Sequence, residues 1–312
     1  MDLTQKPIAI LGYGNQGRAH ALNLRDSGCQ VRVGARPGVG FELARKDGFE
    51  PMPFETACDQ SQILMFLLPD LVIPSVYERL APYFKDGQRE VGFCHGYAYH
   101  FGKIEKFSKT GYFLAGPKGA GVLLRDTFER GKILPGVLAI DSPRKETREI
   151  AVAYARAVGL AHETLVETTF EEETECDLFG EQVVLCGGLL ELMETAFEVL
   201  VESGQTPEMA FLECCYEAKL ILDLWLHEGP ANLYKKISPT AFYGGMTRGK
   251  RLVDASSREK MRQALQEIKK GQFSAEWEQE ALAGFPQLKA RQQSAQESLL
   301  EKTYQALKQR LQ

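Results

Sequence analysis

The sequence predicts an α/β protein, with a doubly wound parallel sheet in its first half and an all-helical domain in its second. Three observations lead to this prediction. Short apolar runs alternate with helical stretches before about residue 165, long helical runs follow, and 312 residues suit two domains of ~150 residues each. We place the boundary between residues 168 and 169, on the change of pattern alone, and expect each half to form its own core.

Six segments of the first half have the length and composition of buried strands, with turn residues nearby. They are Pro7–Leu11, Gln30–Gly34, Ile63–Leu68, Glu90–Cys94, Tyr112–Ala115 and Gly136–Ile140. Helical stretches lie between several of them, at Gly17–Ser27, Phe41–Asp47 and Val76–Phe84. Strands that alternate with helices favour a parallel sheet covered on both faces.

The second half contains four long runs with apolar residues at helical spacing, and few strand-like stretches separate them. They are Asp177–Val201, Pro207–Leu226, Ser257–Lys269 and Ala290–Leu311. Residues 289–312 are rich in Gln, Lys and Glu, which indicates a solvated terminal helix.

Composition excludes several classes of partner. The net charge is −5, from 37 basic and 42 acidic residues, so nucleic acid would be repelled. We find neither an export signal at the amino terminus nor an apolar run long enough for a membrane span. The seven cysteines are scattered and show no zinc or disulfide pattern. These features are typical of a cytoplasmic protein with free thiols, acting on a small molecule.

A glycine motif follows the first predicted strand directly. The run Ile8–Leu11 leads into GYGNQG, and residues 19–24 are helical in pattern. There, GxGxxG typically binds a dinucleotide: the first glycine permits a tight turn, the second admits the pyrophosphate, and the third lets the helix pack near the strand. A merely structural glycine turn is the alternative. We predict a Rossmann-type dinucleotide-binding domain, with a cofactor site that includes Gly12, Tyr13, Gly14, Asn15, Gln16 and Gly17.

The end of the second predicted strand indicates which dinucleotide binds. An acidic residue about twenty positions after the motif usually bonds the ribose 2′-hydroxyl of NAD, but residues 33–36 are Val-Gly-Ala-Arg. Arg36 is a candidate partner of a 2′-phosphate, so we favour NADP over NAD; a solvated loop arginine is the alternative. We also assign Asp70 and Gly121 to the cofactor site.

Four carboxylates occur in pairs in two apolar helices of the second half. Asp177 and Glu181 are four residues apart, as are Glu213 and Glu217, so each pair shares a helix face. Carboxylates without histidine or thiolate ligands suit Mg²⁺, which would also relieve the repulsion within each pair. We predict a magnesium site; surface salt bridges, with Lys219 as one candidate partner, are the alternative.

Two further candidates follow predicted strands, where an open α/β sheet binds ligands. Lys118 lies in a glycine-rich turn and could contact a phosphate or a substrate oxyanion. His95 follows the run Glu90–Cys94, and a hydrogen-bonded core histidine is an equal alternative for it. Cys94 and His95 do not form a nucleophilic pair, because neighbours on a strand point to opposite faces.

These residues closely resemble the ketol-acid reductoisomerase family, also called acetohydroxy-acid isomeroreductases. The resemblance covers nearly the whole chain, whose length is similar to that of the short, class I type. Residues 167–188 are its most specific stretch. The other segments that carry it are Gly12–His20, Phe93–Gly96, Pro117–Gly119 and Ile237–Ser238.

The resemblance implies NADP on the first domain, two Mg²⁺ ions in a knotted helical second domain, and a homodimer or higher homo-oligomer with shared sites. The implied reaction is alkyl migration in a 2-hydroxy-3-oxo acid, 2-acetolactate or 2-aceto-2-hydroxybutyrate, assisted by Mg²⁺. Hydride reduction to a 2,3-dihydroxy-3-methyl acid follows, in the biosynthesis of valine and isoleucine.

The resemblance also implies roles for single residues. Asp177 would bridge the metals, Glu181 would be a further ligand, and the remaining groups would come from the partner chain: Glu213, Glu217 and Ser238, the last for the substrate carboxylate. Lys118 would stabilise an oxygen through its charge or a bound water, and His95 would orient cofactor and solvent.

Several positions depart from the family pattern. The loop Pro37–Phe41 is one residue short and lacks the usual serines, so mixed or NADH use is plausible. Asn15 replaces a serine, Ala120–Val122 replaces Pro-Gly-His or similar, and Phe242 replaces a glutamate. A paralogue that acts on a related 2-hydroxy-3-oxo acid is therefore one alternative. A metal-independent reductase of the β-hydroxyacid dehydrogenase type and a nucleotide-binding pseudoenzyme are the others.

Overall fold

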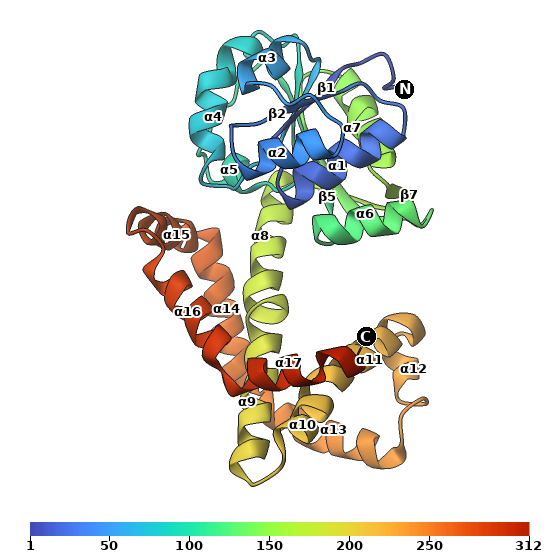
Figure 1. Cartoon of the computed structure of the whole chain (residues 1–312), viewed down its shortest axis with the longest axis vertical. Coiled ribbons are helices and arrows are strands. Elements are labelled where there is room, and N and C mark those ends of the chain that lie inside the picture. The colour runs from blue at the N-terminus through green and yellow to red at the C-terminus, as the bar shows by residue number, and fades with distance from the viewer. Residues whose placement is uncertain (312) are drawn as a thin grey trace. The chain divides into compact units, whose positions relative to one another are not determined.

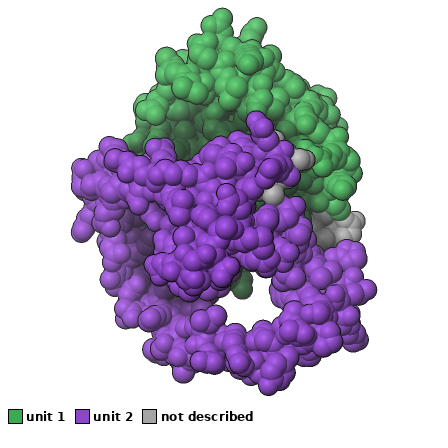
Figure 2. Space-filling view, turned by 60° about the horizontal axis from the view of Figure 1, so that its bottom comes forward, with its two compact units in different colours: residues 1–176 green, residues 177–312 purple. Residues whose placement is uncertain are grey.

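The structure is a computed structural model that describes residues 1–311, apart from the side chains of residues 161–164 and 311. It divides into two compact units, the first ending at Cys176 and the second beginning at Asp177 (Figure 2). Helix α8 (Phe170–Gly180) runs through this division without a break. The boundary between residues 168 and 169 lies just before α8 and stays a prediction about the functional domains.

The first unit is built on one seven-stranded sheet (Figure 1). Its order is β2 (Val31–Gly34), β1 (Ile8–Leu11), β3 (Ile63–Phe66), β4 (Glu90–Phe93), β5 (Gly111–Pro117), β6 (Leu134–Asp141) and β7 (Leu160–Thr168). All six predicted strands are present, and β7 is an additional one. Neighbours are parallel except β5 and β6, which are antiparallel, so the sheet is mixed rather than wholly parallel. An apolar sequence pattern does not indicate the direction of a strand, so the antiparallel pair could not be predicted from it.

Helices cover both faces of this sheet, as a doubly wound fold requires. Alternate residues of β1 belong to different cores, Ile8 and Ile10 to one and Ala9 and Leu11 to the other. The first core includes buried residues of α1 (Asn15–Asp26), α2 (Val39–Lys46), α6 (Gly121–Glu129) and α7 (Glu146–Ala157). The second includes residues of α3 (Phe54–Asp59), α4 (Ile73–Leu80), α5 (Tyr97–His100) and α8, and η1 (Ala81–Tyr83) lies beside it.

The strand order reverses at β1, because β2 lies on one side of it and β3 on the other. In open α/β sheets, ligands bind outside the carboxyl ends of the strands at such a point. The glycine motif begins directly after β1, so the fold places it at this crevice.

The second unit is all-helical, as predicted, but three of the four predicted long helices are interrupted. The first run becomes the end of α8, the π-helical turn η2 (Glu181–Leu185) and α9 (Gly188–Glu202). The second becomes α10 (Pro207–Phe211), the π-helical turn η3 (Leu212–Tyr216) and α11 (Glu217–Glu228). The remaining helices are α12 (Pro230–Leu233), α13 (Pro239–Leu252), α14 (Ala255–Lys269), α15 (Gln272–Leu282), α16 (Pro286–Glu297) and α17 (Leu299–Leu311), with a break at Ser298 in the fourth predicted run.

The expected second core does not form within one chain. Among the described side chains of this unit, the buried apolar ones are Leu178, Phe197, Ala210, Ile268 and Leu307. Many large apolar side chains are exposed instead, including Leu226, Tyr243 and Leu252, which are 74%, 64% and 68% exposed. Apolar surface of this kind is typical of an interface rather than of a finished monomer. None of the described helices combines the length and the apolar character needed to cross a membrane.

Candidate functional site

The glycine motif has the backbone geometry of a phosphate-binding turn. Gly12 has a φ of +103°, and a Cβ atom there would lie 2.5 Å from the carbonyl oxygen of Leu67. A Cβ atom on Gly17 would lie 2.1 Å from the carbonyl oxygen of Gly12, so only glycine lets α1 start this close to β1. At Gly14 nothing lies within 4 Å of such an atom, which leaves space for a ligand beside the backbone. The open amides at the start of α1 face this space and suit an anion.

Tyr13 fixes the motif to the segment after α2. Its hydroxyl donates to Asp47 at 2.9 Å, and Arg18 donates to the same carboxylate through Nε and Nη2 at 2.6 and 3.0 Å. The bidentate Arg18 guanidinium lowers the pKa of Asp47, and the Tyr13 hydroxyl adds to the effect. Sequence reasoning missed Asp47, which is distant from the motif in the chain.

Gln16 and Asn15 join the motif to the turn that contains Lys118. The Gln16 side-chain amide donates to the carbonyl oxygen of Gly119 at 3.0 Å. A Cβ atom on Gly121 would lie 2.1 Å from the carbonyl oxygen of Asn15, so the start of α6 touches the start of α1. The phosphate turn and the Lys118 turn are therefore in direct contact.

Arg36 and Asp70 lie at the carboxyl ends of β2 and β3 respectively. Arg36 is exposed, and its side chain forms no hydrogen bond or ion pair within the described part of the chain. The loop that follows holds Gly38, at the start of α2, and has no serine or threonine. Asp70 is half-buried between β3 and α4.

The buried carboxylate of Glu173 connects the two catalytic candidates. Its Oε1 accepts a hydrogen bond from the Lys118 ammonium at 3.4 Å. Its Oε2 accepts one from the Gly96 amide at 3.0 Å and lies 3.3 Å from Nδ1 of His95. Only 2% of this side chain is exposed, so its charge requires these donors. The structure thus brings His95 and Lys118 together on an acid that sequence reasoning did not select.

Helix α8 reaches this position because Gly96 lets it approach. A Cβ atom on Gly96 would lie 2.3 Å from Oγ1 of Thr174 and 2.9 Å from the Phe170 carbonyl oxygen. Any larger residue would push α8 and Glu173 away. A sequence signal for Glu173 exists, since it lies four residues before Asp177 and continues the series to Glu181 on one helix face.

Glu173 also belongs to a group with metal-ligand spacing. One ligand atom from each of His95, Glu173 and Asp177 lies within 4.8 Å of the others. Asp177 lies one helical turn after Glu173 on α8, so the helix itself sets the distance between these two carboxylates. Two carboxylates near one point fit a hard divalent cation such as Mg²⁺.

The second carboxylate pair does not join this group within a single chain. Glu213 and Glu217 are exposed, and among the described residues neither belongs to a group that could hold a metal ion. Lys219, the candidate salt-bridge partner, pairs with Asp223 instead. Glu181 is also exposed and lies outside the group of His95, Glu173 and Asp177, so among the described residues one subunit does not gather the four predicted ligands.

Ser238 caps a helix. Its Oγ accepts a hydrogen bond from the amide of Ala241 at 3.1 Å at the start of α13. The side chain is exposed, and its hydroxyl hydrogen is free to point to a ligand.

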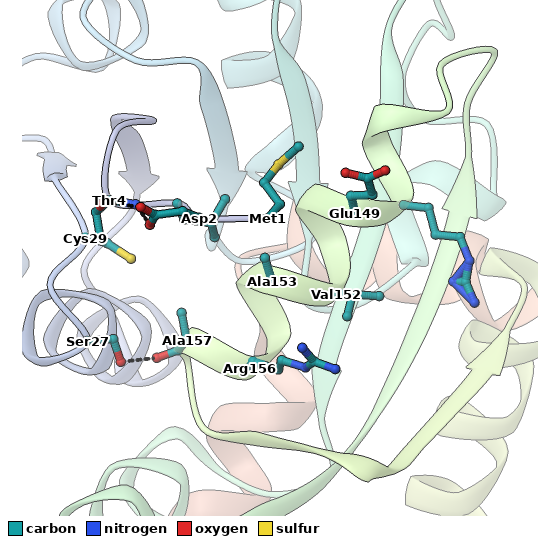
Figure 3. A pocket seen from close by; sticks show the side chains of 12 residues that line it. Met1, Asp2, Thr4, Ser27, Cys29, Glu149, Val152, Ala153, Arg156 and Ala157 are labelled. Carbon is teal, nitrogen blue, oxygen red and sulfur yellow. Dashed lines mark hydrogen bonds between the residues drawn. The ribbon is translucent and has the colours of Figure 1, made fainter.

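A cavity of about 610 Å³ lies elsewhere in the first unit, between the N-terminal segment and α7 (Figure 3). Thr4 and Cys29 at its wall precede β1 and β2, so it lies near the amino ends of these strands. Ala153 and Ala157 of α7 face it (Figure 3). It contains none of the predicted site residues and lies away from the crevice where such sheets bind nucleotides.

Comparisons with known proteins identify the family of the chain. Residues 2–163 match the family described as acetohydroxy acid isomeroreductase, NADPH-binding domain, and residues 170–312 match ketol-acid reductoisomerase, C-terminal domain. The chain is 44% identical over 306 residues to the ketol-acid reductoisomerase (NADP(+)) of Methanocaldococcus jannaschii, covering 97% of this chain and 92% of the relative. It is 44% identical over 289 residues to that of Sulfurisphaera tokodaii, covering 92% and 87%.

A solved structure resembles the whole chain. It is an NADH-preferring ketol-acid reductoisomerase from an uncultured archaeon, 38% identical, with a TM-score of 0.94 over 98% of this chain and 95% of that one. Both family models together span both halves of the sequence. The chain therefore belongs to the short, class I type of the ketol-acid reductoisomerase family, the enzymes of branched-chain amino-acid biosynthesis.

Proposed function

We propose that this chain converts 2-acetolactate and 2-aceto-2-hydroxybutyrate into 2,3-dihydroxy-3-methyl acids, by alkyl migration followed by reduction. The observation that carries the proposal is the buried Glu173 carboxylate, held between His95 and Lys118 at the carboxyl ends of β4 and β5. This is the edge of the sheet where the glycine motif also lies. Glu173, His95 and the Lys118 ammonium therefore lie at the edge of the sheet where a bound cofactor would place its nicotinamide ring.

The cofactor is NADPH in this proposal, with NADH as a usable alternative. Exposed Arg36 supports a contact with the 2′-phosphate, and the open space at Gly14 supports a pyrophosphate. The loop after Arg36 offers no hydroxyl to the phosphate, and a similar solved enzyme prefers NADH, so the discrimination should be modest. The bound nicotinamide would supply the hydride.

Two Mg²⁺ ions complete the proposed site. Asp177 and Glu181 would hold them from one chain, and Glu213 and Glu217 from a second copy, because one chain does not gather both pairs. The bound ions would act as Lewis acids on the adjacent hydroxyl and carbonyl oxygens of the substrate. The exposed apolar side chains of the second unit support a homodimer as the smallest active form.

Each remaining residue has a proposed task at a stated atom. The Lys118 ammonium stabilises negative charge on a substrate oxygen, directly or through a water. Glu173 holds that ammonium and can accept a proton from solvent or substrate. His95 orients the cofactor and solvent from beside Glu173. The exposed Ser238 hydroxyl donates to the substrate carboxylate. We further propose a cytoplasmic location, which the free thiols support.

One assay tests cofactor, metal and substrate together. Oxidation of NADPH and of NADH is followed by absorbance with 2-acetolactate, with Mg²⁺ or with EDTA. We expect oxidation only with Mg²⁺, faster with NADPH. Turnover of a 2-oxo or 3-hydroxy acid in EDTA would instead support a metal-independent reductase. NADPH binding without oxidation would support a nucleotide-binding protein that has lost its reaction, and turnover of a different 2-hydroxy-3-oxo acid would identify a paralogue.

A further inference from the structure

The second unit contains two turns of π-helix, in which hydrogen bonds span five residues instead of four. In η2 the amide of Cys186 donates to the carbonyl oxygen of Glu181 at 2.8 Å, and the Gly187 amide reaches the same oxygen at 3.0 Å. In η3 the amide of Glu217 donates to the carbonyl oxygen of Leu212. Elsewhere in residues 1–311 the helices are of the α or 3₁₀ type.

Both π-helical turns coincide with the carboxylate pairs that the sequence singled out. Glu181 supplies the carbonyl that closes the first turn, and its pair member Asp177 lies one turn before it. Glu213 lies inside the second turn, and Glu217 supplies the amide that closes it. A π-helical turn is rare and is frequently found at functional sites. Because each π-helical turn lies at one predicted ligand pair, we infer that the two turns have the same function.

The first π-helical turn, η2, requires glycine at two positions, 187 and 188. A Cβ atom on Gly187 would lie 2.0 Å from the carbonyl oxygen of Gln182, and one on Gly188 would lie 2.1 Å from that of Val183. Both are backbone atoms, which cannot rotate aside. At Gly180 and Gly244, in regular helices, such an atom would meet nothing within 4 Å apart from the neighbouring backbone of the same helix. The crowding therefore comes from the wider turn and not from helical geometry as such.

The extra residue of the turn separates two faces of what would otherwise be one helix. Before it, α8 presents Asp177; after it, α9 buries Phe197, which is 2% exposed, and packs against α10 and η3. Because helical faces repeat every 3.6 residues, one inserted residue rotates everything that follows relative to everything before it. The direction of the carboxylates that precede the turn is then independent of the packing of α9 after the turn.

We propose that Gly187 and Gly188 are positioning residues for the metal, which hold Glu181 in its ligand orientation by permitting the π-helical turn. The inference rests on the proposed function, in which Glu181 binds Mg²⁺. It adds that the orientation of Glu181 depends on the backbone conformation at Gly187 and Gly188, which have no side chain that could bind the metal. A substitution at either glycine should therefore damage metal binding without touching the cofactor.

The test uses the full chain and Mn²⁺ as the probe, with binding measured by electron paramagnetic resonance in the absence of substrate. Gly188→Ala and Gly187→Ala should each weaken Mn²⁺ binding by about 10- to 100-fold, the range seen when partners of a metal ligand are lost. NADPH affinity should stay unchanged, and turnover should recover as Mg²⁺ is raised. Gly244→Ala, in a helix with open space around the glycine, is the matched control and should bind Mn²⁺ normally.

The outcomes separate the inference from the proposed function. If the wild type and Glu181→Gln both fail to bind Mn²⁺, the magnesium proposal itself is wrong. If the wild type binds, Glu181→Gln does not, and both alanine variants bind normally, the positioning role is wrong. Should the alanine variants not fold, hydrogen exchange of the wild type decides: Mg²⁺ should slow exchange at the Cys186 and Gly187 amides but not at Gly244, and equal rates with and without Mg²⁺ contradict the inference.

Discussion

The two units of this protein differ in how much of their apolar core and of their proposed site a single chain forms. In the first unit, both faces of the sheet are covered by buried apolar side chains, and the glycine motif has its full geometry. In the second, five apolar side chains are buried among those described, while many other apolar side chains and three of the four predicted ligands, Glu181, Glu213 and Glu217, are exposed. We infer from this contrast that cofactor binding is a property of one chain, whereas the proposed metal site needs a second. Substitutions in either unit can test the contrast.

The largest effect is expected from loss of a metal ligand in the second unit. Glu217→Gln should lower turnover of 2-acetolactate by more than about 100-fold, above the range for outer partners of a ligand, because a neutral amide is a poor ligand for Mg²⁺. NADPH binding, measured by fluorescence titration, should be unchanged. Asp223→Asn on the same helix is the control, since Asp223 forms an exposed ion pair with Lys219. Normal turnover of Glu217→Gln would remove Glu217 from the site.

The next effect concerns association. Leu226 is 74% exposed on α11 in a single chain, and Leu226→Glu should place a charge in the proposed interface. We expect sedimentation analysis to show a shift from dimer to monomer, with loss of turnover and retention of NADPH binding. Ile133→Glu is the control: this residue of the first unit is 58% exposed, and the substitution should leave the mass of the dimer in sedimentation unchanged. A fully active monomer of Leu226→Glu would contradict the contrast between the units.

A smaller effect is expected within the first unit. Arg36→Ser should weaken NADPH binding by about 10- to 100-fold, because one charge-assisted hydrogen bond to a phosphate contributes roughly 1.5–3 kcal/mol. The KM for NADH, which has no 2′-phosphate, should not change. Arg45→Ser on α2 is the control, since Arg45 lies 4.0 Å from Glu42 in an exposed pair. Equal losses for both cofactors would place Arg36 outside the 2′-phosphate site.

The smallest effect is a pH dependence of the first unit's stability. His20 is fully buried on α1, its Nδ1 lies 2.8 Å from the Tyr154 hydroxyl, and burial lowers its pKa to about 3 from 6.5. Below pH 6.5 the unfolded chain binds a proton that the folded chain does not, so stability falls by about 1.4 kcal/mol per pH unit. Urea unfolding at pH 7 and pH 5 should show this loss for the wild type, and a smaller one for His20→Gln. Equal losses would mean that His20 does not drive the dependence.

The sequence predicted the parts of the fold that local patterns encode. The GYGNQG motif after an apolar run located the β1–α1 turn, and apolar spacing located the helices. It could not show that β6 runs antiparallel to β5, because direction depends on the path of the connection. It also read residues 177–201 as one helix, although Gly187-Gly188 was a visible sign of a special turn.

Candidate site residues could be selected from the sequence by residue type, whereas contacts that depend on the tertiary structure could not. Paired carboxylates and a lysine after a strand were recognisable by chemistry. Which acid of the run Glu171–Glu173 turns inward was not, because it depends on the close approach of α8 to Gly96. The contact between Gln16 and Gly119 joins segments far apart in the chain and was equally hidden.

Mixed dimers provide the sharpest test of a metal site shared between two chains. Asp177→Asn and Glu217→Gln each remove a ligand from a different pair, so each homodimer should be inactive. If the two pairs come from different chains, co-expressed variants form mixed dimers in which one of the two sites is intact, and random pairing should restore about a quarter of the wild-type rate. If each chain builds its own site, the mixture should stay as inactive as either variant alone, and the shared site would be wrong.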